Sequence, residues 1–230
     1  VRTHMKICYL DAFSGISGDM AVGALVDAGA DWKALEDALK SLNLPASFRV
    51  EKTKRRGMAA SKFHVEAADD KKHRHLPHIE KIITAGSLSE RSKKNALSVF
   101  QNLGEAEARS HAVPIEKVHF HEVGAVDSIC DIVGACVALD LLGVEEVYCS
   151  QINVGSGTVN TEHGVLPVPA PATAELLKGR PVYSAGPEAE LTTPTGAALA
   201  TSLAKEFGSL PAVRLLAQGF GARALGKSQV

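Results

Sequence analysis

Val118 to Asp131 reads V-H-F-H-E-V-G-A-V-D-S-I-C-D, and the fold can be inferred outward from this stretch. Alternating apolar and polar residues at its start predict a short strand that carries His119 and His121 on one face. After Gly124 the apolar residues recur at helical spacing. The stretch therefore predicts a strand that runs directly into a helix.

The same stretch holds a candidate metal site. Asp127 and Asp131 lie one helical turn apart, and Glu122 follows the second histidine. Neighbouring carboxylates repel one another, and a divalent cation that also took His119 and His121 as ligands would relieve this repulsion. A half-exposed strand face and an acidic first helical turn explain the same residues without a metal, so both interpretations stay open.

Composition limits the classes of function. The chain has 230 residues, of which 45% are hydrophobic and 22% are charged, with a formal net charge of -1. This length allows one large domain or two small ones, and the charge does not indicate a nucleic-acid-binding surface. No apolar run approaches the roughly 18–20 residues that span a bilayer, so we expect no membrane partner. Four cysteines without C-x-x-C spacing favour reduced thiols in the cytoplasm.

A glycine-containing loop follows the first predicted strand, Lys6 to Leu10. The loop reads D-A-F-S-G-I-S-G-D-M over Asp11 to Met20 and leads into a helix. Exposed amides at such a helix start can bind an anion, and a cation could bridge the acidic residues to a phosphate. A tight turn with a simple N-cap is the alternative. The candidate contacts for an anion here are Ser14, Gly15, Ser17, Gly18 and Asp19.

A second candidate anion site lies near the end of the chain. T-T-P-T-G, over Thr192 to Gly196, predicts a helix with Thr193 as its N-cap and Pro194 at its first position. Hydroxyl groups crowded at a positive helix end suit a phosphate or carboxylate, although capping alone also explains them. The candidate contacts are Thr193, Thr195 and Gly196.

Further histidines could add metal ligands. H-R-H-L-P-H supplies His73 and His75. A turn in the Gly- and Pro-rich region, Ile152 to Thr173, contains His163. Histidines in polar loops can equally face solvent and bind nothing, and their spacing alone does not decide between these alternatives.

The rest of the chain predicts a mixed architecture. Phe48–Thr53 and Ser61–Glu66 are expected to form a β-hairpin, and Ser87 with Glu90 resembles a capping box for a helix reaching about Ser110. Pro211–Phe220 is expected to form a last strand. We predict an α/β fold in which a mixed sheet of short strands has flanking helices, in up to two subdomains. The expected segments are 5–66, an α/β subdomain; 67–111, helical; and 112–230, the α/β subdomain that carries the site.

Five motifs in this order resemble the LarC nickel-insertion family. They are D-A-F-S-G-I-S-G-D-M at Asp11, H-R-H-L at His73, H-F-H-E-V-G-A-V-D-S-I-C-D-I at His119, H-G-V-L-P-V-P-A-P-A-T at His163 and E-L-T-T-P-T-G-A-A at Glu190. The likeness is colinear from Met5 to about Gly221, and five long motifs together make it specific.

The resemblance implies a cytoplasmic nickel chelatase, an enzyme that inserts nickel into pyridinium-3,5-bisthiocarboxylic acid mononucleotide and consumes CTP with Mg or Mn. Its product is the nickel-pincer cofactor of lactate racemase-type enzymes. Transferred to this sequence, it implies catalytic roles for His119, His121 and Asp127. The implied metal ligands are His73, His75, His119, His121, Glu122, Asp127, Asp131 and His163.

Members of this family usually continue into a further domain associated with CTP. The resemblance therefore implies that a C-terminal domain or subunit of the same protein is a partner, and we also expect a homo-oligomer. Two other functions stay open: a non-catalytic nickel carrier and a metal-dependent hydrolase of a nucleotide or an amide.

Overall fold

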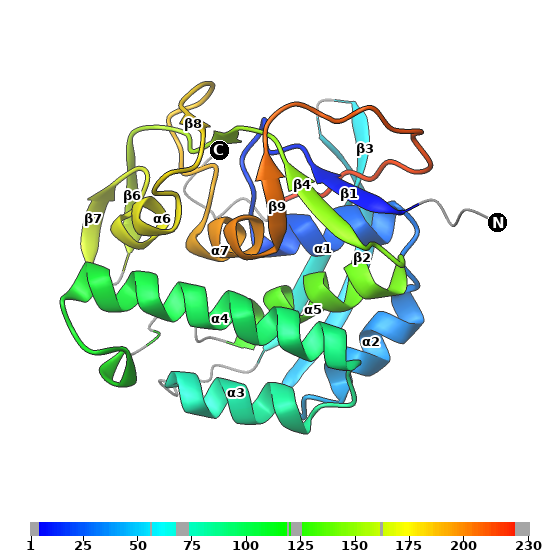
Figure 1. Cartoon of the computed structure of the whole chain (residues 1–230), viewed down its shortest axis with the longest axis horizontal. Helices are drawn as coiled ribbons and strands as arrows, with labels where there is room; N and C mark the ends of the chain where they lie inside the picture. The colour runs from blue at the N-terminus through cyan, green and yellow to red at the C-terminus, as the bar shows by residue number, and fades with distance from the viewer. Residues whose placement is uncertain are drawn as a thin grey trace.

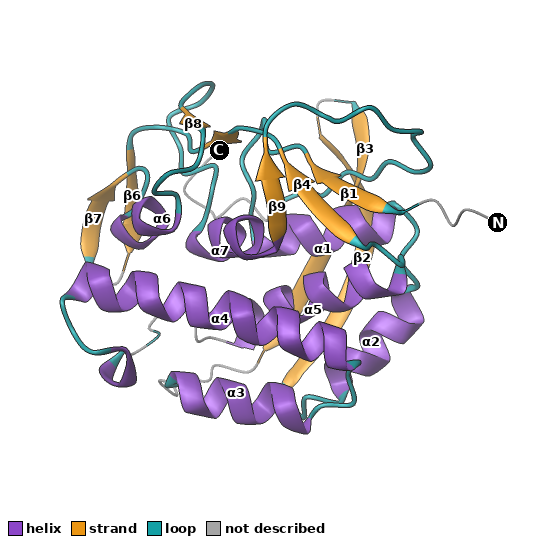
Figure 2. Cartoon of the chain, viewed as in Figure 1, coloured by secondary structure: helices purple, strands orange, loops and turns teal. Residues whose placement is uncertain are grey.

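The computed structural model describes residues 5–55, 57–67, 74–118, 120, 126–161 and 163–223. The helices are α1 (Gly18–Asp27), α2 (Trp32–Lys40), α3 (Leu76–Ala85), α4 (Glu90–His111), the 3-10 turn η1 (Ile115–Lys117), α5 (Val126–Leu141), α6 (Pro171–Leu176) and α7 (Pro194–Leu203). The strands are β1 (Ile7–Leu10), β2 (Ala46–Arg55), β3 (Met58–Ala67), β4 (Glu146–Cys149), β5 (Ile152–Asn153), β6 (Thr158–Thr161), β7 (Gly164–Pro167), β8 (Val182–Tyr183) and β9 (Ala204–Phe207). The predicted α/β fold of short strands and flanking helices is confirmed (Figure 2).

A parallel sheet joins distant parts of the chain. Its strand order is β1-β4-β9, and both pairings are parallel. Since the strands run in one direction, the loops that follow β1 and β4 leave from the same edge of the sheet (Figure 1). Ala12 and Ser150 hold these loops together, because the backbone N–H of Ala12 donates to Ser150 Oγ over 2.9 Å. In open sheets of this kind, ligands bind beyond the carboxyl ends of the strands.

The helix predicted from the Val118–Asp131 stretch is α5, and it lies at the centre of the core. Its residues from Ile132 to Leu139 are all buried, and it contacts α1, α2, α4, α7 and β3. A helix that is hydrophobic on nearly all sides needs such surroundings. The acidic residues of its first turns are therefore held by the best-packed element of the molecule.

The predicted hairpin is β2–β3, and α1 packs closely on it. Phe63 of β3 stacks at 6.4 Å from Phe48 and meets Trp32 edge-on at 6.1 Å. A methyl group at Gly23 of α1 would lie 2.4 Å from the carbonyl oxygen of Ser61. Helix and strand can approach so closely only because this residue is glycine.

Two local predictions were wrong. The N-cap of α4 is Ser89, whose side chain accepts from the N–H of Ser92, and the predicted capping box at Ser87 does not form. Pro211–Phe220 contains no strand. Its position beside β3 is instead fixed at one end, where the N–H of Ser61 donates to the carbonyl of Phe220 over 2.8 Å.

Strands also occur where none was expected. The Gly- and Pro-rich region forms the antiparallel pair β6–β7, and β9 completes the parallel sheet. The division at residues 66/67 and 111/112 stays a prediction. In the part of the chain that the structure describes, no helix is both long and apolar enough to cross a bilayer.

Candidate functional site

The two predicted anion-binding loops lie against each other. Thr193 N–H donates to the carbonyl of Ile16 over 3.1 Å. A methyl group at Gly196 would lie 2.0 Å from that same carbonyl oxygen, and one at Gly15 would lie 2.0 Å from the carbonyl oxygen of Leu191. Both glycines are therefore required for this contact, and Gly15 also has a φ of 80°. The structure brings together the loops 11–17 and 191–196, as their shared predicted role requires.

The hydroxyl groups of these loops largely serve the loops themselves. Thr193 Oγ1 accepts from the N–H of Gly196 over 3.1 Å, which confirms it as the N-cap of α7. Thr192 Oγ1 donates to the carbonyl of Asn153 over 2.8 Å, and Thr195 is buried. Ser17 occupies the N-cap position of α1 but makes no capping bond; its hydroxyl donates to Asp19. Ser14 is exposed.

Three predicted carboxylates gather where α1 and α5 begin. Asp131 lies against the first turn of α1, since a methyl group at Gly18 would be 2.7 Å from its Oδ2. The N–H of Asp19 donates to Asp131, and the charges of Asp19 and Asp127 act on it. Part of Asp131 remains exposed, but packed atoms desolvate its carboxylate. That desolvation, followed by the two neighbouring charges, raises the pKa of Asp131 well above its usual value.

The other two carboxylates have more external positions. Asp127 is exposed and accepts from the N–H of Ser128 over 2.8 Å. Asp19 is partly exposed and accepts from the N–H of Met20 over 2.9 Å. The cluster therefore has one desolvated carboxylate at its base and two that reach solvent.

The H-R-H-L motif meets the central stretch. Phe120 N–H donates to the carbonyl of Arg74 over 3.4 Å in an antiparallel bridge. Arg74 is buried. Its charge acts on the thiol of Cys130, as do the charges of Asp131 and Asp127. Two motifs that are more than forty residues apart therefore lie side by side, and the charge of Arg74 acts on the same thiol as the charges of the carboxylates.

His75 has the hydrogen bond that a metal-ligating histidine commonly has. Its Nδ1 lies 3.0 Å from the carbonyl oxygen of Val118. A carbonyl can only accept, so Nδ1 carries a proton and donates it to Val118. In metal sites, a backbone carbonyl commonly fixes the orientation of a ligating histidine in this way.

His163 lies in a different environment. It is exposed at the β6–β7 turn, and its ring is 4.9 Å from that of His111 at the end of α4. His111 was not among the predicted ligands. The predicted ligands His73, His119, His121 and Glu122 lie outside the described residues. Within the described residues, no three His, Cys, Asp or Glu side chains are arranged to hold a metal ion.

Asn153 is a residue of this region that the sequence reasoning missed. It is buried, and its Nδ2 donates to the carbonyls of Phe13 and Ala185 over 2.9 and 3.0 Å. Its Oδ1 accepts from the N–H groups of Gly155 and Ala185 over 3.2 and 3.1 Å. A lone amide in the apolar run I-N-V was the available signal, because a buried amide needs partners. This side chain ties the loop after β1 to two loops from the second half of the chain.

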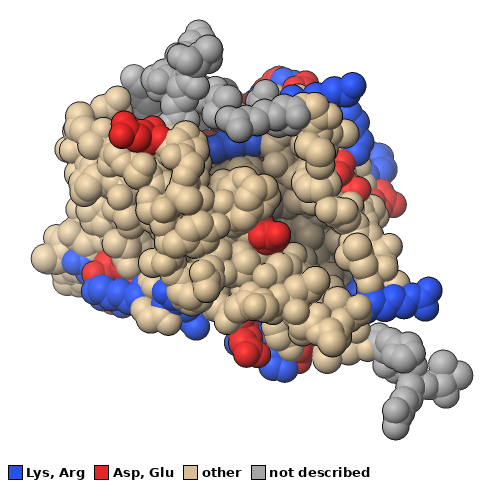
Figure 3. Space-filling model, turned by 90° about the horizontal axis from the view of Figure 1, so that it is seen from above, with Lys and Arg blue, Asp and Glu red and all other residues tan. Residues whose placement is uncertain are grey.

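Seen from above, the face in Figure 3 consists mostly of side chains other than Lys, Arg, Asp and Glu. Basic side chains gather mainly toward its edges (Figure 3).

A family model described as "Nickel insertion protein" matches residues 8–229. The chain belongs to the nickel insertion protein family. It is 49% identical over 219 residues to the pyridinium-3,5-bisthiocarboxylic acid mononucleotide nickel insertion protein of Desulfitobacterium hafniense, covering 95% of this chain and 54% of that protein. It is 51% identical over 221 residues to a putative nickel insertion protein of Geotalea uraniireducens, covering 95% of this chain and 57% of that protein.

A third relative is similar over nearly the same length. The pyridinium-3,5-bisthiocarboxylic acid mononucleotide nickel insertion protein of Staphylococcus epidermidis is 44% identical over 218 residues, or 94% of this chain and 55% of that protein. The chain therefore spans about half the length of the curated relatives it matches. No solved structure matches it.

Proposed function

We propose that this chain binds Ni(II) and acts in its insertion into pyridinium-3,5-bisthiocarboxylic acid mononucleotide, with nickel as a substrate. The observation that carries the proposal is the desolvated carboxylate of Asp131 beside Asp19 and Asp127. A buried acid surrounded by other acids reduces stability unless a cation joins it. Family membership, together with the printed names of two relatives, supports nickel as that cation.

The proposed ligands combine oxygen and nitrogen donors. Asp131 and Asp127 supply carboxylates, and His75 supplies an imidazole whose tautomer is already set by Val118. We include the sequence neighbours of Phe120, which are His119 and His121, together with His73, Glu122 and His163, as further ligands. Carboxylate and imidazole are harder ligands than thiocarboxylate sulfur. Such a site can therefore release nickel to the sulfurs of the substrate.

The proposed reaction needs one proton acceptor. When nickel bonds to two thiocarboxylate sulfurs and one ring carbon, that carbon loses its proton. A neutral imidazole of His119 or His121 would accept the proton, because the ordinary pKa of histidine, about 6.5, is close to neutral pH. Asp127 would orient that imidazole or bind the metal.

The proposal also assigns positions to the rest of the reaction. The mononucleotide phosphate would lie at the joined loops, which contain Ser14 to Asp19 and Thr193 to Gly196. We also propose that CTP takes part together with Mg or Mn. A C-terminal domain or subunit of the same protein is a further partner, and the chain forms a homo-oligomer. We place the reaction in the cytoplasm, which the four free cysteines support.

Nickel titration of purified variants tests the metal site. Asp131→Asn should weaken nickel binding at least tenfold, since one charged ligand is lost. Asp140→Asn is the matched control, because Asp140 lies on the same helix nine residues away, about 13 Å along its axis. His75→Gln and His121→Ala should each lower affinity or stoichiometry. Unchanged binding in Asp131→Asn would remove the carboxylate cluster from the site.

A second arm separates the enzyme from a nickel carrier. The apo-mononucleotide, nickel and CTP with Mg are mixed with the chain, with and without the additional C-terminal region of a relative. Appearance of the pincer chromophore in either mixture supports insertion. Nickel binding without the chromophore in both mixtures would identify a carrier. Hydrolysis of a nucleotide or amide would identify the third alternative.

A further inference from the structure

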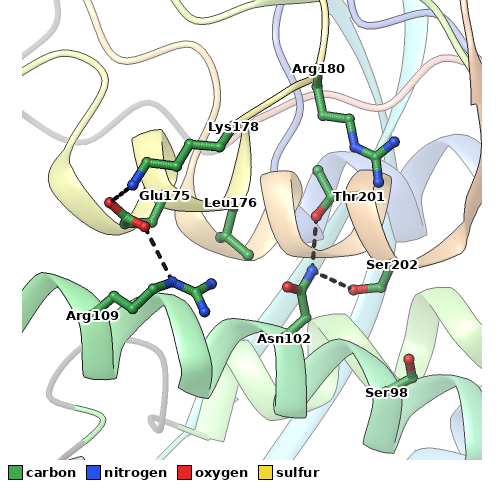
Figure 4. A pocket seen from close by; sticks show the side chains of 9 residues that line it. All are labelled: Ser98, Asn102, Arg109, Glu175, Leu176, Lys178, Arg180, Thr201 and Ser202. Carbon is green, nitrogen blue, oxygen red and sulfur yellow. Dashed lines mark hydrogen bonds and ion pairs between the residues drawn. The ribbon is translucent and has the colours of Figure 1, made fainter. Parts of the chain in front are cut away.

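A groove between three helices lies apart from the motif loops. It has a volume of about 490 Å³ and is lined by side chains of α4, α6, α7 and the α6–β8 loop (Figure 4). These residues are Ser98, Asn102, Arg109, Glu175, Leu176, Lys178, Arg180, Thr201 and Ser202. Thr201 is eight residues beyond Thr193, so the groove is about 12 Å along α7 from the loop described above. It is therefore a separate place on the molecule.

The groove is basic, although the chain as a whole has a net charge of -1. The lining contains three basic side chains, those of Arg109, Lys178 and Arg180, and one carboxylate, that of Glu175. Outside the lining, Arg109 also pairs with Glu105 over 3.7 Å. Glu175 Oε2 is 3.2 Å from Nε of Arg109, and its other oxygen pairs with Lys178. Even with Glu105 counted, two carboxylates do not neutralise three cations, so the groove keeps an excess of positive charge.

Arg180 is the cation available to a ligand. Among the described residues its side chain makes no hydrogen bond or ion pair, and its guanidinium carbon lies 5.0 Å from the centre of the Phe207 ring. Cation–π contact of this kind restricts the guanidinium without using its N–H donors. In Figure 4 the guanidinium extends toward the side of the groove that holds Thr201 and Ser202.

The side of the groove that Arg180 faces presents fixed polar groups. Asn102 Nδ2 donates to Thr201 Oγ1 and to Ser202 Oγ, each over 3.0 Å (Figure 4). Thr201 in turn donates to the carbonyl of Ala197 over 2.8 Å. These bonds hold the hydroxyl groups in place. Leu176 is the only aliphatic side chain in the lining, so the groove offers little to a planar apolar ring.

Helix ends explain only part of this arrangement. Lys178 follows the C-terminal end of α6, where a cation is favoured by the helix dipole. That effect reaches only the last turn. It explains neither Arg109, which extends across from α4, nor the orientation of Arg180 over Phe207.

We propose that this groove binds a phosphate-bearing small molecule through its phosphoryl group, with Arg180 and Arg109 as the charged donors. Guanidinium groups match phosphate geometry, and the hydroxyl groups of Ser98 and Ser202 suit a sugar or a second phosphate. The volume falls within the range of about 300–1,000 Å³ typical of small-molecule sites. This inference does not depend on the nickel site.

Calorimetric titration of the purified chain tests it, with inorganic phosphate, pyrophosphate and ribose 5-phosphate as separate probes at constant ionic strength. At least one probe should bind, and the pattern identifies a free phosphate, a diphosphate or a sugar phosphate as the preferred class. Arg180→Gln should weaken that binding about tenfold, because one charge-assisted hydrogen-bond donor is lost. Glu175→Gln should strengthen it, because the repelling carboxylate of the lining is removed.

Arg214→Gln is the matched control, since Arg214 is also exposed but lies outside the groove. It should leave binding unchanged. Absence of binding by all three probes would overturn the proposal. So would an equal loss in Arg180→Gln and Arg214→Gln, which would indicate non-specific charge attraction. Thermal melting of each variant without ligand verifies that the groove is still folded.

Discussion

Two carboxylates at opposite ends of α1 have opposite environments. Asp27 is the last residue of α1, and its carboxylate accepts from Lys52, from Ser61 over 2.7 Å and from the N–H of Phe220 over 3.0 Å. Asp131 reaches the first turn of α1 from α5 and faces Asp19 and Asp127. The side chain of Asp27 is only 15% exposed. Both carboxylates are therefore removed from much of the solvent, but among the residues that the structure describes, a cation and a hydroxyl group are seen as partners of Asp27 alone.

The difference appears in their acidity. Burial pushes the pKa of Asp27 upward, but the bonds from Lys52, Phe220 and Ser61 outweigh it and the net pKa is lowered. Burial and like charges together raise the pKa of Asp131. Asp27 therefore stabilises the folded chain as an anion, whereas ionised Asp131 opposes folding. A residue that costs stability in this way is more readily explained by a ligand than by the fold.

Asp27→Ala should be the most damaging change. It leaves the hydroxyl of Ser61, which is completely buried, without its acceptor and frees Phe220 from α1. We expect the free energy of unfolding to fall by about 2–4 kcal/mol, since unpaired buried donors cost about 1–3 kcal/mol each. Urea denaturation measures this value. A loss below about 0.5 kcal/mol would show that water replaces the carboxylate and that the two ends of α1 are energetically alike.

Asp131→Asn should act in the opposite direction. Between the usual pKa of Asp and the raised pKa of Asp131, the folded state binds more protons than the unfolded state, so wild-type stability falls as pH rises. The amide does not ionise and avoids this loss. At pH 7 the variant should be more stable by about 1 kcal/mol, a size typical of relieved strain at functional sites.

Denaturation of both proteins from pH 4 to pH 8 provides the measurement. The advantage of Asp131→Asn should grow with pH and should shrink when nickel is added, because the proposed metal would stabilise only the wild-type carboxylate. Equal destabilisation of the variant at every pH would show that the carboxylate is structural, like that of Asp27.

The sequence predicted the positions of individual helices better than it predicted the contacts between them. Apolar periodicity correctly located α5, and Thr193 with Pro194 correctly located the start of α7. These signals are local, because periodicity and capping depend on residues a few positions apart. The strand predicted for Pro211–Phe220 failed for the same reason: an apolar run says nothing about whether a neighbouring strand is available to pair.

Long-range pairings could not be read from one sequence. Nothing near Arg74 indicates that its carbonyl would bond to Phe120, and nothing near Asp27 indicates Lys52, Ser61 or Phe220 as its partners. The candidate site was therefore predicted as a set of residue types rather than as a geometry. The structure adds that Asp131 lies against Gly18, which connects the central stretch to the first loop.

Lys52→Met should have the smallest effect. Its ammonium pairs with Asp27, but the side chain is 73% exposed, and exposed ion pairs contribute only about 0–1 kcal/mol. Removing it raises the pKa of Asp27 toward its usual value while Ser61 and Phe220 still donate. The stabilisation by a carboxylate with a lowered pKa is present above its unfolded pKa and is lost as pH falls through the folded pKa. The variant should therefore be less stable than wild type at pH 7 and as stable as wild type below about pH 3. Acid denaturation monitored by circular dichroism measures this difference. A difference that persists at low pH would mean that Lys52 acts through the packing of its aliphatic chain rather than through its charge.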